Sequence, residues 1–341
     1  MRFRHFLALT CFLTPASARA ADVTAVVGKD AIEFKSGTEI VAKYFIATTY
    51  SKPFLYPVLA PGGVPVTRGW PIEKGLPGEV KTDHVHQKSV WFCHGDVIPE
   101  GLELKTKSAN RGDQGVDFWS EATDKSGKRR HGQIRVVKVG EPKKTDGGVS
   151  VETQNEWFTA DGEKMMDETR VISFRETTEG RLFTFDITLK ASVCPIAFWD
   201  TKEGSFGIRV HDSLRPEAKD GAVVTTAEGK SLAPPQRDNL PIWGYPTAWI
   251  DYSGKVFGKE VGIAVFDHPD NLKANWHVRA YGLNAANPFA REHSGFPTQK
   301  GKKELYKLPK GGELRLKYAV YAHTGDAKSG KVAAAYASFE K

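Results

Sequence analysis

A short segment of this chain concentrates side chains that can bind metals or transfer protons. Between residues 83 and 96, three histidines, two aspartates, a cysteine and a tryptophan fall within fourteen positions. If the segment is a β-strand, His84 and His86 point to the same face, because side chains alternate along a strand. Two neighbouring imidazoles can bind a divalent metal or move protons near neutral pH. We therefore expect the functional site to include this segment.

The same alternation divides the remaining side chains of the segment. His94 has the parity of His84 and His86, whereas Cys93 has the opposite parity. A nucleophile pair of Cys93 and His94 is therefore unfavourable, and we expect Cys93 to be a small buried residue. A disulfide between Cys93 and Cys194 is the alternative, and their spacing does not decide between the two.

Tryptophans beside polar residues indicate the class of substrate. An aromatic face can stack on the C–H face of a sugar ring, while neighbouring polar side chains hydrogen-bond its hydroxyl groups. Any single tryptophan could instead fill a large β core. As a set they favour a carbohydrate site, because five of them lie next to polar segments: Trp70, Trp91, Trp119, Trp199 and Trp276.

Proton transfer at a sugar works best with two groups whose pKa values are shifted apart. Histidines and carboxylates of the polar segments supply such groups. We predict that the catalytic residues are His84, His86, His94, Asp117, Glu121 and His277. We predict that the substrate-binding residues are Trp119, Trp199, Lys202, Glu203, Arg279 and His268.

Two other chemistries remain open. Asp117 and Glu121 could form the carboxylate pair of a glycosidase, although their separation is unreadable from sequence. His84 and His86 could instead bind a divalent metal, with a third ligand from another histidine or a carboxylate. The chain has no glycine-rich phosphate loop, no Gly-x-Ser-x-Gly elbow and no Cys-x-x-Cys pair, which disfavours nucleotide enzymes and common serine hydrolases.

Strand patterns dominate the elements that must position these residues. Turn signals rich in Gly, Asp and Ser separate the strands, and helical patterns do not intervene. This predicts an all-β fold, a large antiparallel β-sandwich with a short C-terminal helix over residues 327–339. Two stacked sandwiches are the alternative. The expected strands are residues 23–27, 31–34, 39–47, 134–139, 148–158, 166–174, 181–191, 207–210, 222–226, 249–252, 260–266 and 313–323.

The first twenty residues have the pattern of a secretory signal peptide. Arg2 and Arg4 precede an apolar stretch over residues 6–13, and small residues follow at positions 18 and 20. The apolar stretch is too short to span a bilayer, which takes about 20 residues. We predict that residues 1–20 are removed and that residues 21–341 form a single exported domain, periplasmic or extracellular, with no membrane span.

The charge of the chain gives no sign of a nucleic-acid partner. The formal net charge of +7 includes three arginines in residues 1–20, which leaves +4 spread over the rest of the chain. No nucleic-acid recognition motif accompanies this charge. We expect a carbohydrate as the partner, and the sequence does not indicate an oligomeric state.

Several motifs together resemble the PmoA-like family of exported bacterial proteins. They include Asp-His-x-His at residues 83–86 and the segments 90–97, 117–121, 200–207, 266–269 and 276–282. The resemblance spans about residues 40–325 and implies a β-sandwich similar to that of aldose mutarotases. The family label names a methane oxygenase, a membrane copper enzyme, and we consider it misleading for this chain. After Asp-His the family commonly reads Pro-His-His-Arg, where this chain has Val-His-Gln-Lys.

Three functional hypotheses follow. The leading one is an exported carbohydrate-active enzyme of the lyase, epimerase or hydrolase type that uses histidine acid–base chemistry, with or without a divalent metal. The second is a non-catalytic glycan-binding β-sandwich protein. The third is a metal-dependent oxidase, which requires a third ligand to converge on His84 and His86. The placement of the histidines in the structure discriminates among the three.

Overall fold

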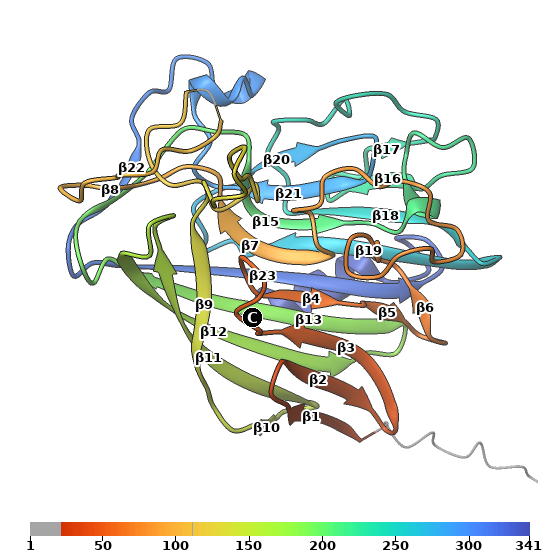
Figure 1. Ribbon diagram of the computed structural model, residues 1–341. Coiled ribbons are helices and arrows are strands. Elements are labelled where there is room, and N and C mark those ends of the chain that lie inside the picture. The colour runs from red at the N-terminus through yellow and green to blue at the C-terminus, as the bar shows by residue number, and fades with distance from the viewer. Residues whose placement is uncertain (1–21, 111) are drawn as a thin grey trace, which may run out of the picture.

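The computed structural model describes residues 22–110 and 112–341, and two large antiparallel β-sheets form the body of the fold (Figure 1). The predicted signal peptide lies outside the described residues. Within the described part of the chain, no helix is long and apolar enough to cross a membrane. The predicted fold class, a large antiparallel β-sandwich with a short C-terminal helix, is confirmed.

The first sheet has eight strands in the order β1-β2-β3-β4-β7-β15-β21-β20. Strands β1 to β3 follow one another along the chain, whereas β7, β15 and β21 come from distant segments. The strands are β1 (Val23–Val27), β2 (Ala31–Ser36), β3 (Glu39–Phe45), β4 (Phe54–Tyr56), β7 (Val90–His94), β15 (Gly204–Arg209), β21 (Leu283–Asn287) and β20 (Asn275–Val278).

The second sheet has ten strands, in the order β10-β11-β12-β13-β23-β19-β18-β16-β17, with β9 also pairing with β11. Burial alternates along β12, as expected for a strand with one face on a core. The strands are β9 (Gln133–Val139), β10 (Lys143–Thr145), β11 (Gly148–Phe158), β12 (Lys164–Glu176), β13 (Gly180–Lys190), β16 (Val223–Thr226), β17 (Ser231–Leu232), β18 (Trp249–Val256), β19 (Lys259–Asp267) and β23 (Glu313–Thr324).

The smaller elements lie around the two sheets. Helix α1 (Val332–Phe339) is shorter than predicted, because Lys331 before it has a left-handed φ of 53°. It packs on Phe266 and Tyr321, on the side of the second sheet that faces away from the first. The others are β5 (Leu59–Ala60), β6 (Val64–Pro65), β8 (Val97–Pro99), β14 (Ile196–Phe198), β22 (Tyr306–Leu308), and the 3-10 turns η1 (Asp212–Leu214), η2 (Glu292–Ser294) and η3 (Pro297–Gln299).

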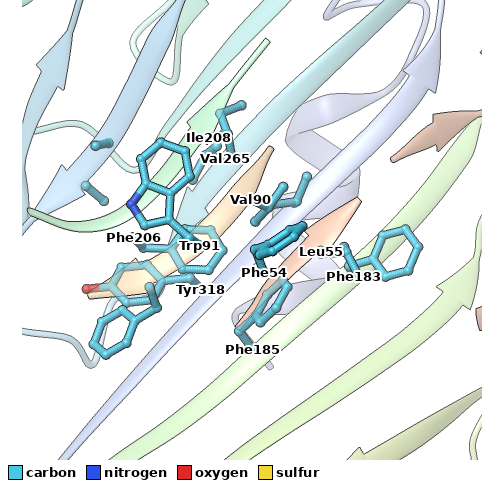
Figure 2. Close-up of a cluster of buried hydrophobic side chains, with 14 of the residues drawn as sticks. Phe54, Leu55, Val90, Trp91, Phe183, Phe185, Phe206, Ile208, Val265 and Tyr318 are labelled. Carbon is cyan, nitrogen blue, oxygen red and sulfur yellow. The ribbon is translucent and has the colours of Figure 1, made fainter. Parts of the chain in front are cut away.

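Aromatic side chains from both sheets fill the space between them. Phe206 of β15 stacks on Tyr318 of β23 with ring centroids 4.8 Å apart, and Phe185 of β13 lies 5.1 Å from Phe206 (Figure 2). Burying one such ring contributes roughly 1.5–3 kcal/mol. The strands of the first sheet are therefore anchored to the second sheet by close packing.

The strand order of the first sheet positions the predicted site. Strands β7, β15, β21 and β20 are consecutive neighbours, although they come from three distant parts of the sequence. The segment of residues 83–89 leads into β7, residues 199–203 lead into β15, and residues 277–281 end β20 and lead to β21. Loops that carry the predicted chemistry are thus brought together by strand pairing.

Candidate active site

A cleft of about 710 Å³ is lined by residues that flank these four strands. A larger hollow, of about 1220 Å³, contains none of the residues predicted from the sequence. The cleft brings together eight of those residues: His84, His86, Trp119, Trp199, Lys202, Glu203, His277 and Arg279. The other four do not line it: His94, Asp117, Glu121 and His268.

His84 and His86 lie in a turn and not in a strand. Strand β7 begins only at Val90, and His84 has a left-handed φ of 45°. The N–H of Gln87 donates to the His84 carbonyl oxygen at 2.9 Å, which closes the turn. The argument from strand alternation was therefore wrong, but the turn still brings the two rings into the cleft, with centroids 5.7 Å apart.

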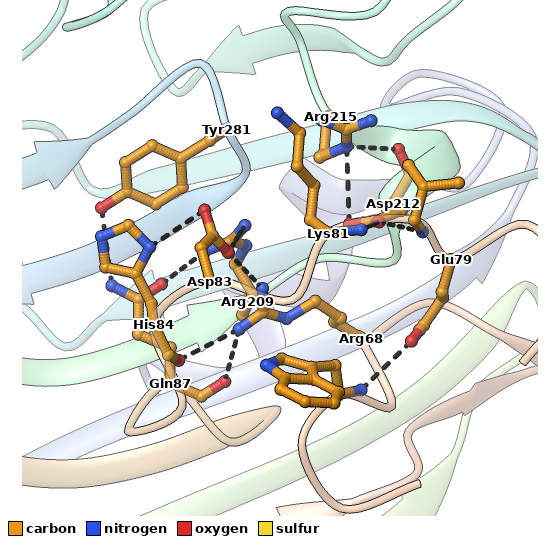
Figure 3. A network of polar contacts seen from close by, with 12 residues as sticks. Arg68, Glu79, Lys81, Asp83, His84, Gln87, Arg209, Asp212, Arg215 and Tyr281 are labelled. Atoms are coloured by element: carbon orange, nitrogen blue, oxygen red, sulfur yellow. Dashed lines mark hydrogen bonds and ion pairs between the residues drawn. The ribbon is translucent and has the colours of Figure 1, made fainter. Parts of the chain in front are cut away.

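Asp83 fixes the orientation of His84 (Figure 3). Its Oδ2 lies 3.0 Å from Nδ1 of His84, and its Oδ1 accepts hydrogen bonds from Arg68 at 2.7 Å and Arg209 at 3.0 Å. A carboxylate beside Nδ1 keeps the proton there, so the neutral ring presents the lone pair of Nε2. The ring of Tyr281 stacks on His84 at 4.8 Å. His84 is thus held as a proton acceptor.

His277 on β20 is held in the opposite tautomer. The indole N–H of Trp243 lies 2.9 Å from Nδ1 of His277. Because an indole N–H can only donate, Nδ1 must accept, and the proton of the neutral ring sits on Nε2. Burial, followed by the charges of Arg279 and Lys202, lowers the pKa of His277 well below its ordinary value. His277 is thus a neutral hydrogen-bond donor.

Replacing Trp243 with phenylalanine should free the His277 tautomer. The rings of Trp243 and His277 lie 6.2 Å apart between centroids in the wild-type protein. Phenylalanine keeps an aromatic ring at position 243 but lacks the N–H donor. In ¹⁵N NMR spectra of labelled histidines, we expect Nδ1 of His277 to change from an unprotonated signal to one averaged between two tautomers. A Trp243→Phe spectrum that still shows a pure Nε2–H form would contradict this assignment.

Glu203 places a free carboxyl group in the same cleft. It precedes β15 directly, and the N–H of Gly95 at the end of β7 donates to its carbonyl oxygen at 2.7 Å. A Cβ at Gly95 would lie 2.6 Å from that oxygen, so the approach requires glycine. The carboxyl group of Glu203 makes no hydrogen bond or ion pair with residues 22–110 or 112–341. Burial raises its pKa, although the charge of Lys202 acts in the opposite direction.

Glu121 lies behind the cleft in a different role from the one predicted. Its carboxylate is bound by Lys88 at 2.5 Å and by Lys52 at 3.5 Å. Burial raises the pKa of Glu121, but the two lysines outweigh it and lower the pKa overall. Burial and the charge of Lys52 lower the pKa of nearby His86 to about 3. Glu121 therefore stays ionised in a buried charge cluster, and His86 stays neutral.

Asp117 supports the loop that carries Trp119. It accepts hydrogen bonds from the backbone N–H groups of Trp119 at 2.7 Å and Ser120 at 3.0 Å, and from the Asn110 amide at 2.8 Å. These bonds occupy its lone pairs. The structure therefore does not pair Asp117 with Glu121 across the cleft, as a glycosidase would require.

His94 and His268 are also outside the cleft. Nδ1 of His94 lies 3.2 Å from the Ser205 hydroxyl and Nε2 lies 2.8 Å from the Trp199 carbonyl oxygen, so both nitrogens are occupied. His268 follows β19 and packs against Phe339 of α1, with centroids 5.2 Å apart. His94 supports Trp199, and His268 belongs to a different region of the fold.

The two predicted stacking residues differ in exposure. Trp119 is only 2% exposed and meets Trp91 edge-on at 5.1 Å. Trp199 is half-buried and offers more of its ring to the cleft. Neither indole N–H has a hydrogen-bond partner among the described residues. Trp199 is therefore the better-placed platform for a sugar ring.

The other expectations concern metals and thiols. Among the described residues, no group of three or more His, Cys, Asp or Glu side chains is placed to hold a metal ion. The structure therefore does not supply a third ligand to His84 and His86. Cys93 and Cys194 are both free, and burial raises the pKa of Cys93 to about 12. Cys93 is thus a buried thiol, as expected for a small apolar residue.

Three residues of the site are not among the catalytic and substrate-binding residues predicted from the sequence. Asp83 stands directly before the His-x-His motif, and its position could have identified it as the partner of His84. Tyr281 falls two residues after Arg279, within a segment already considered chemical. Trp243 gave no signal, because the loop that carries it is distant in sequence from every predicted site segment.

The protein is all-β, and its cleft is lined by loop residues that flank the paired strands β7, β15, β21 and β20. The chain belongs to a family of unknown function, DUF6807, which matches residues 31–337. The predicted membership of the PmoA-like family is therefore wrong, since the matching family is a different one. No protein with a curated function matches the sequence.

Solved structures with similar strand arrangements have very different sequences. One is a galactose mutarotase-like protein from Clostridium acetobutylicum, with 11% identity, a TM-score of 0.40, and coverage of 89% of this chain and 99% of that one. Another, from Lactobacillus casei, has 12% identity, a TM-score of 0.35, and coverage of 89% and 100%. An alpha-galactosidase from Lactobacillus brevis has 9% identity and a TM-score of 0.39 over 89% of this chain. The chain spans 40% of the length of that galactosidase.

Proposed function

We propose that this protein is an exported carbohydrate-active enzyme of the epimerase or lyase type that works by acid–base chemistry. One observation carries the proposal: His84 and His277 are held in opposite tautomers in one cleft that also contains the free carboxyl group of Glu203. A proton acceptor, a neutral donor and a carboxyl group with a raised pKa are the set that proton transfer at a sugar carbon requires.

Each group has a distinct role in this proposal. Nε2 of His84, aligned by Asp83, removes a proton from the sugar. Glu203, with its raised pKa, delivers a proton to carbon or to a leaving oxygen. Nε2–H of His277 donates a hydrogen bond to an oxygen that gains negative charge in the transition state. Trp199 stacks on the ring.

Hydrolysis by a pair of carboxylates is the less favoured reaction. Such a mechanism needs two carboxyl groups facing one glycosidic bond. Asp117 is saturated by hydrogen bonds and Glu121 is paired with two lysines, and the other two aspartates of the cleft, Asp113 and Asp200, also accept hydrogen bonds. The geometry therefore favours proton transfer over paired-carboxylate hydrolysis.

Export and the single-domain organisation remain part of the proposal. Export rests on the signal-like pattern of residues 1–20. A single domain over residues 21–341 is supported by one hydrophobic cluster that includes strands of both large sheets. Mass spectrometry of the protein secreted by an expressing bacterium would locate the mature N-terminus, which we expect at Ala21.

The test is hydrogen exchange between solvent and sugars. Incubating the protein with mono- and oligosaccharides in D₂O should introduce deuterium at one sugar C–H position, or produce an alkene signal in ¹H NMR. His84→Asn should slow this reaction by at least about 100-fold, whereas His268→Asn, a matched change outside the cleft, should not. Sugar binding with neither deuterium uptake nor any product would favour the glycan-binding alternative.

A further inference from the structure

Two cations of the cleft form no ion pair with the described residues, although the Glu203 carboxyl group is close enough for both to lower its pKa. Lys202 and Arg279 both line the cleft, yet neither forms an ion pair with a described residue. The cations behind the cleft are paired, as Lys88 is with Glu121. A partly buried cation without a partner costs free energy. A protein retains such a group where a ligand supplies the missing charge.

The guanidinium group of Arg279 lies over the ring of Tyr281. Its Cζ lies 5.3 Å from the ring centroid of Tyr281, and its backbone N–H donates to the Leu283 carbonyl oxygen at 3.0 Å. Its Nε is buried and has no acceptor among the residues that the structure describes. A planar guanidinium with an unused donor edge matches the two oxygens of a carboxylate.

Among the described residues, none of the other acids of the cleft forms an ion pair with Lys202 or Arg279. Asp200 accepts hydrogen bonds from three backbone N–H groups within residues 291–294. Asp113 accepts a hydrogen bond from a serine hydroxyl. Burial favours the neutral form of Glu203. Lys202 and Arg279 both line the cleft and both act on the pKa values of His277 and Glu203, so their unpaired charges are available to an anionic group bound beside those two residues.

We propose that Lys202 and Arg279 form a subsite for the carboxylate of a uronic acid residue, so that the substrate is an acidic sugar or oligosaccharide. This inference rests on the proposed acid–base function. A carboxylate has a chemical consequence that a sulfate or phosphate ester lacks, because it acidifies the neighbouring C–H bond. Positive charge next to that carboxylate stabilises the negative charge that forms when the proton leaves.

The step balances without an oxidant or a reductant. His84 takes the proton from C5 of the uronate, and the electron pair of that C–H bond moves toward the carboxylate. In a lyase, this pair then forms the C4–C5 double bond, the C4–O bond breaks, and the leaving oxygen takes a proton from Glu203. In an epimerase, Glu203 instead returns a proton to the opposite face of C5.

Calorimetric titration with matched sugars tests the subsite. We expect the full chain to bind trisaccharides of galacturonate, glucuronate or guluronate at least about tenfold more tightly than their neutral counterparts. Arg279→Gln and Lys202→Met should each weaken binding of the preferred uronide by about 10- to 100-fold. Lys255→Met, at a lysine that is 66% exposed and far from the cleft lining, should leave it unchanged.

A second measurement separates a binding role from a structural one. Because Arg279 has no partner in the described protein, Arg279→Gln should raise Tm by about 2–4 °C. A fall in Tm would assign Arg279 to the stability of the fold and overturn the subsite. A sulfated sugar that binds as tightly as the uronide would overturn the carboxylate assignment.

Comparing neutral with acidic sugars distinguishes a failure of the carboxylate subsite from a failure of the proposed acid–base function. If neutral sugars exchange deuterium as fast as uronides, the carboxylate subsite is wrong and the acid–base function stands. If no sugar, neutral or acidic, is bound or changed, the proposed function fails together with the subsite.

Discussion

Replacing Asp83 with asparagine should destabilise the folded protein by about 3 kcal/mol. Asp83 is the carboxylate partner of both Arg68 and Arg209, whose side chains are 0% exposed. Asparagine has the same shape but no charge, so it leaves two buried guanidinium groups uncompensated. Urea denaturation of wild type and variant measures this change in the free energy of unfolding, provided that the m value is the same for both proteins.

A matched control isolates the effect of burial. Asp186 forms an ion pair with Arg315, whose side chain is 60% exposed. Asp186→Asn should change stability by no more than about 1 kcal/mol, because exposed pairs contribute little. Equal losses for the two aspartates would show that Asp83 is not the counter-ion of a buried arginine pair.

The effect of Asp83 should depend on pH in a defined direction. Burial alone would raise its pKa, but the hydrogen bond from His84 and the charges of Arg209 and Arg68 lower the pKa far below the ordinary range. A group with a depressed folded pKa stabilises the fold above its unfolded value of about 3.9. That contribution is lost as pH falls through the lower folded value. The difference in the free energy of unfolding between wild type and Asp83→Asn should therefore have its maximum value at pH 7 and decrease below about pH 4.

Much of the fold was predictable from local patterns. The sequence predicts a strand over residues 166–174, and in the structure burial alternates along these residues of β12. Sheet order was not predictable, because it depends on which distant strands pair. Nothing in the sequence of β4 (Phe54–Tyr56) indicates that it pairs with β7 (Val90–His94), or that β15 lies beyond β7.

The site was predictable in composition but not in geometry. Asp-His-Val-His has the alternation of a strand, and the left-handed backbone of His84 that turns it into a loop leaves no trace in residue type. His94 and Glu121 have the chemistry of catalytic groups, but their tertiary partners occupy them. Only the structure shows that His94 contacts the Ser205 hydroxyl and that two lysines bind Glu121.

Glu203→Gln should lower kcat by about 10²- to 10⁴-fold on the sugar identified by deuterium exchange. Glutamine fills the same space and keeps hydrogen-bonding ability but cannot deliver a proton. The variant should be at least as stable as wild type, because the buried carboxyl group of Glu203 has no partner to lose among the described residues. Glu260→Gln, at a surface glutamate that is 70% exposed, is the matched control and should keep full activity.

The pH profile of wild type distinguishes the two roles that Glu203 could have. Burial raises its pKa, and an acid is active only below its pKa. If Glu203 donates the proton, kcat/KM should fall as pH rises through that raised value. An increase in rate over the same range would make Glu203 the base, and Nε2–H of His277 would then be the donor. A Glu203→Gln variant that changes KM and leaves kcat intact would place Glu203 in substrate binding alone.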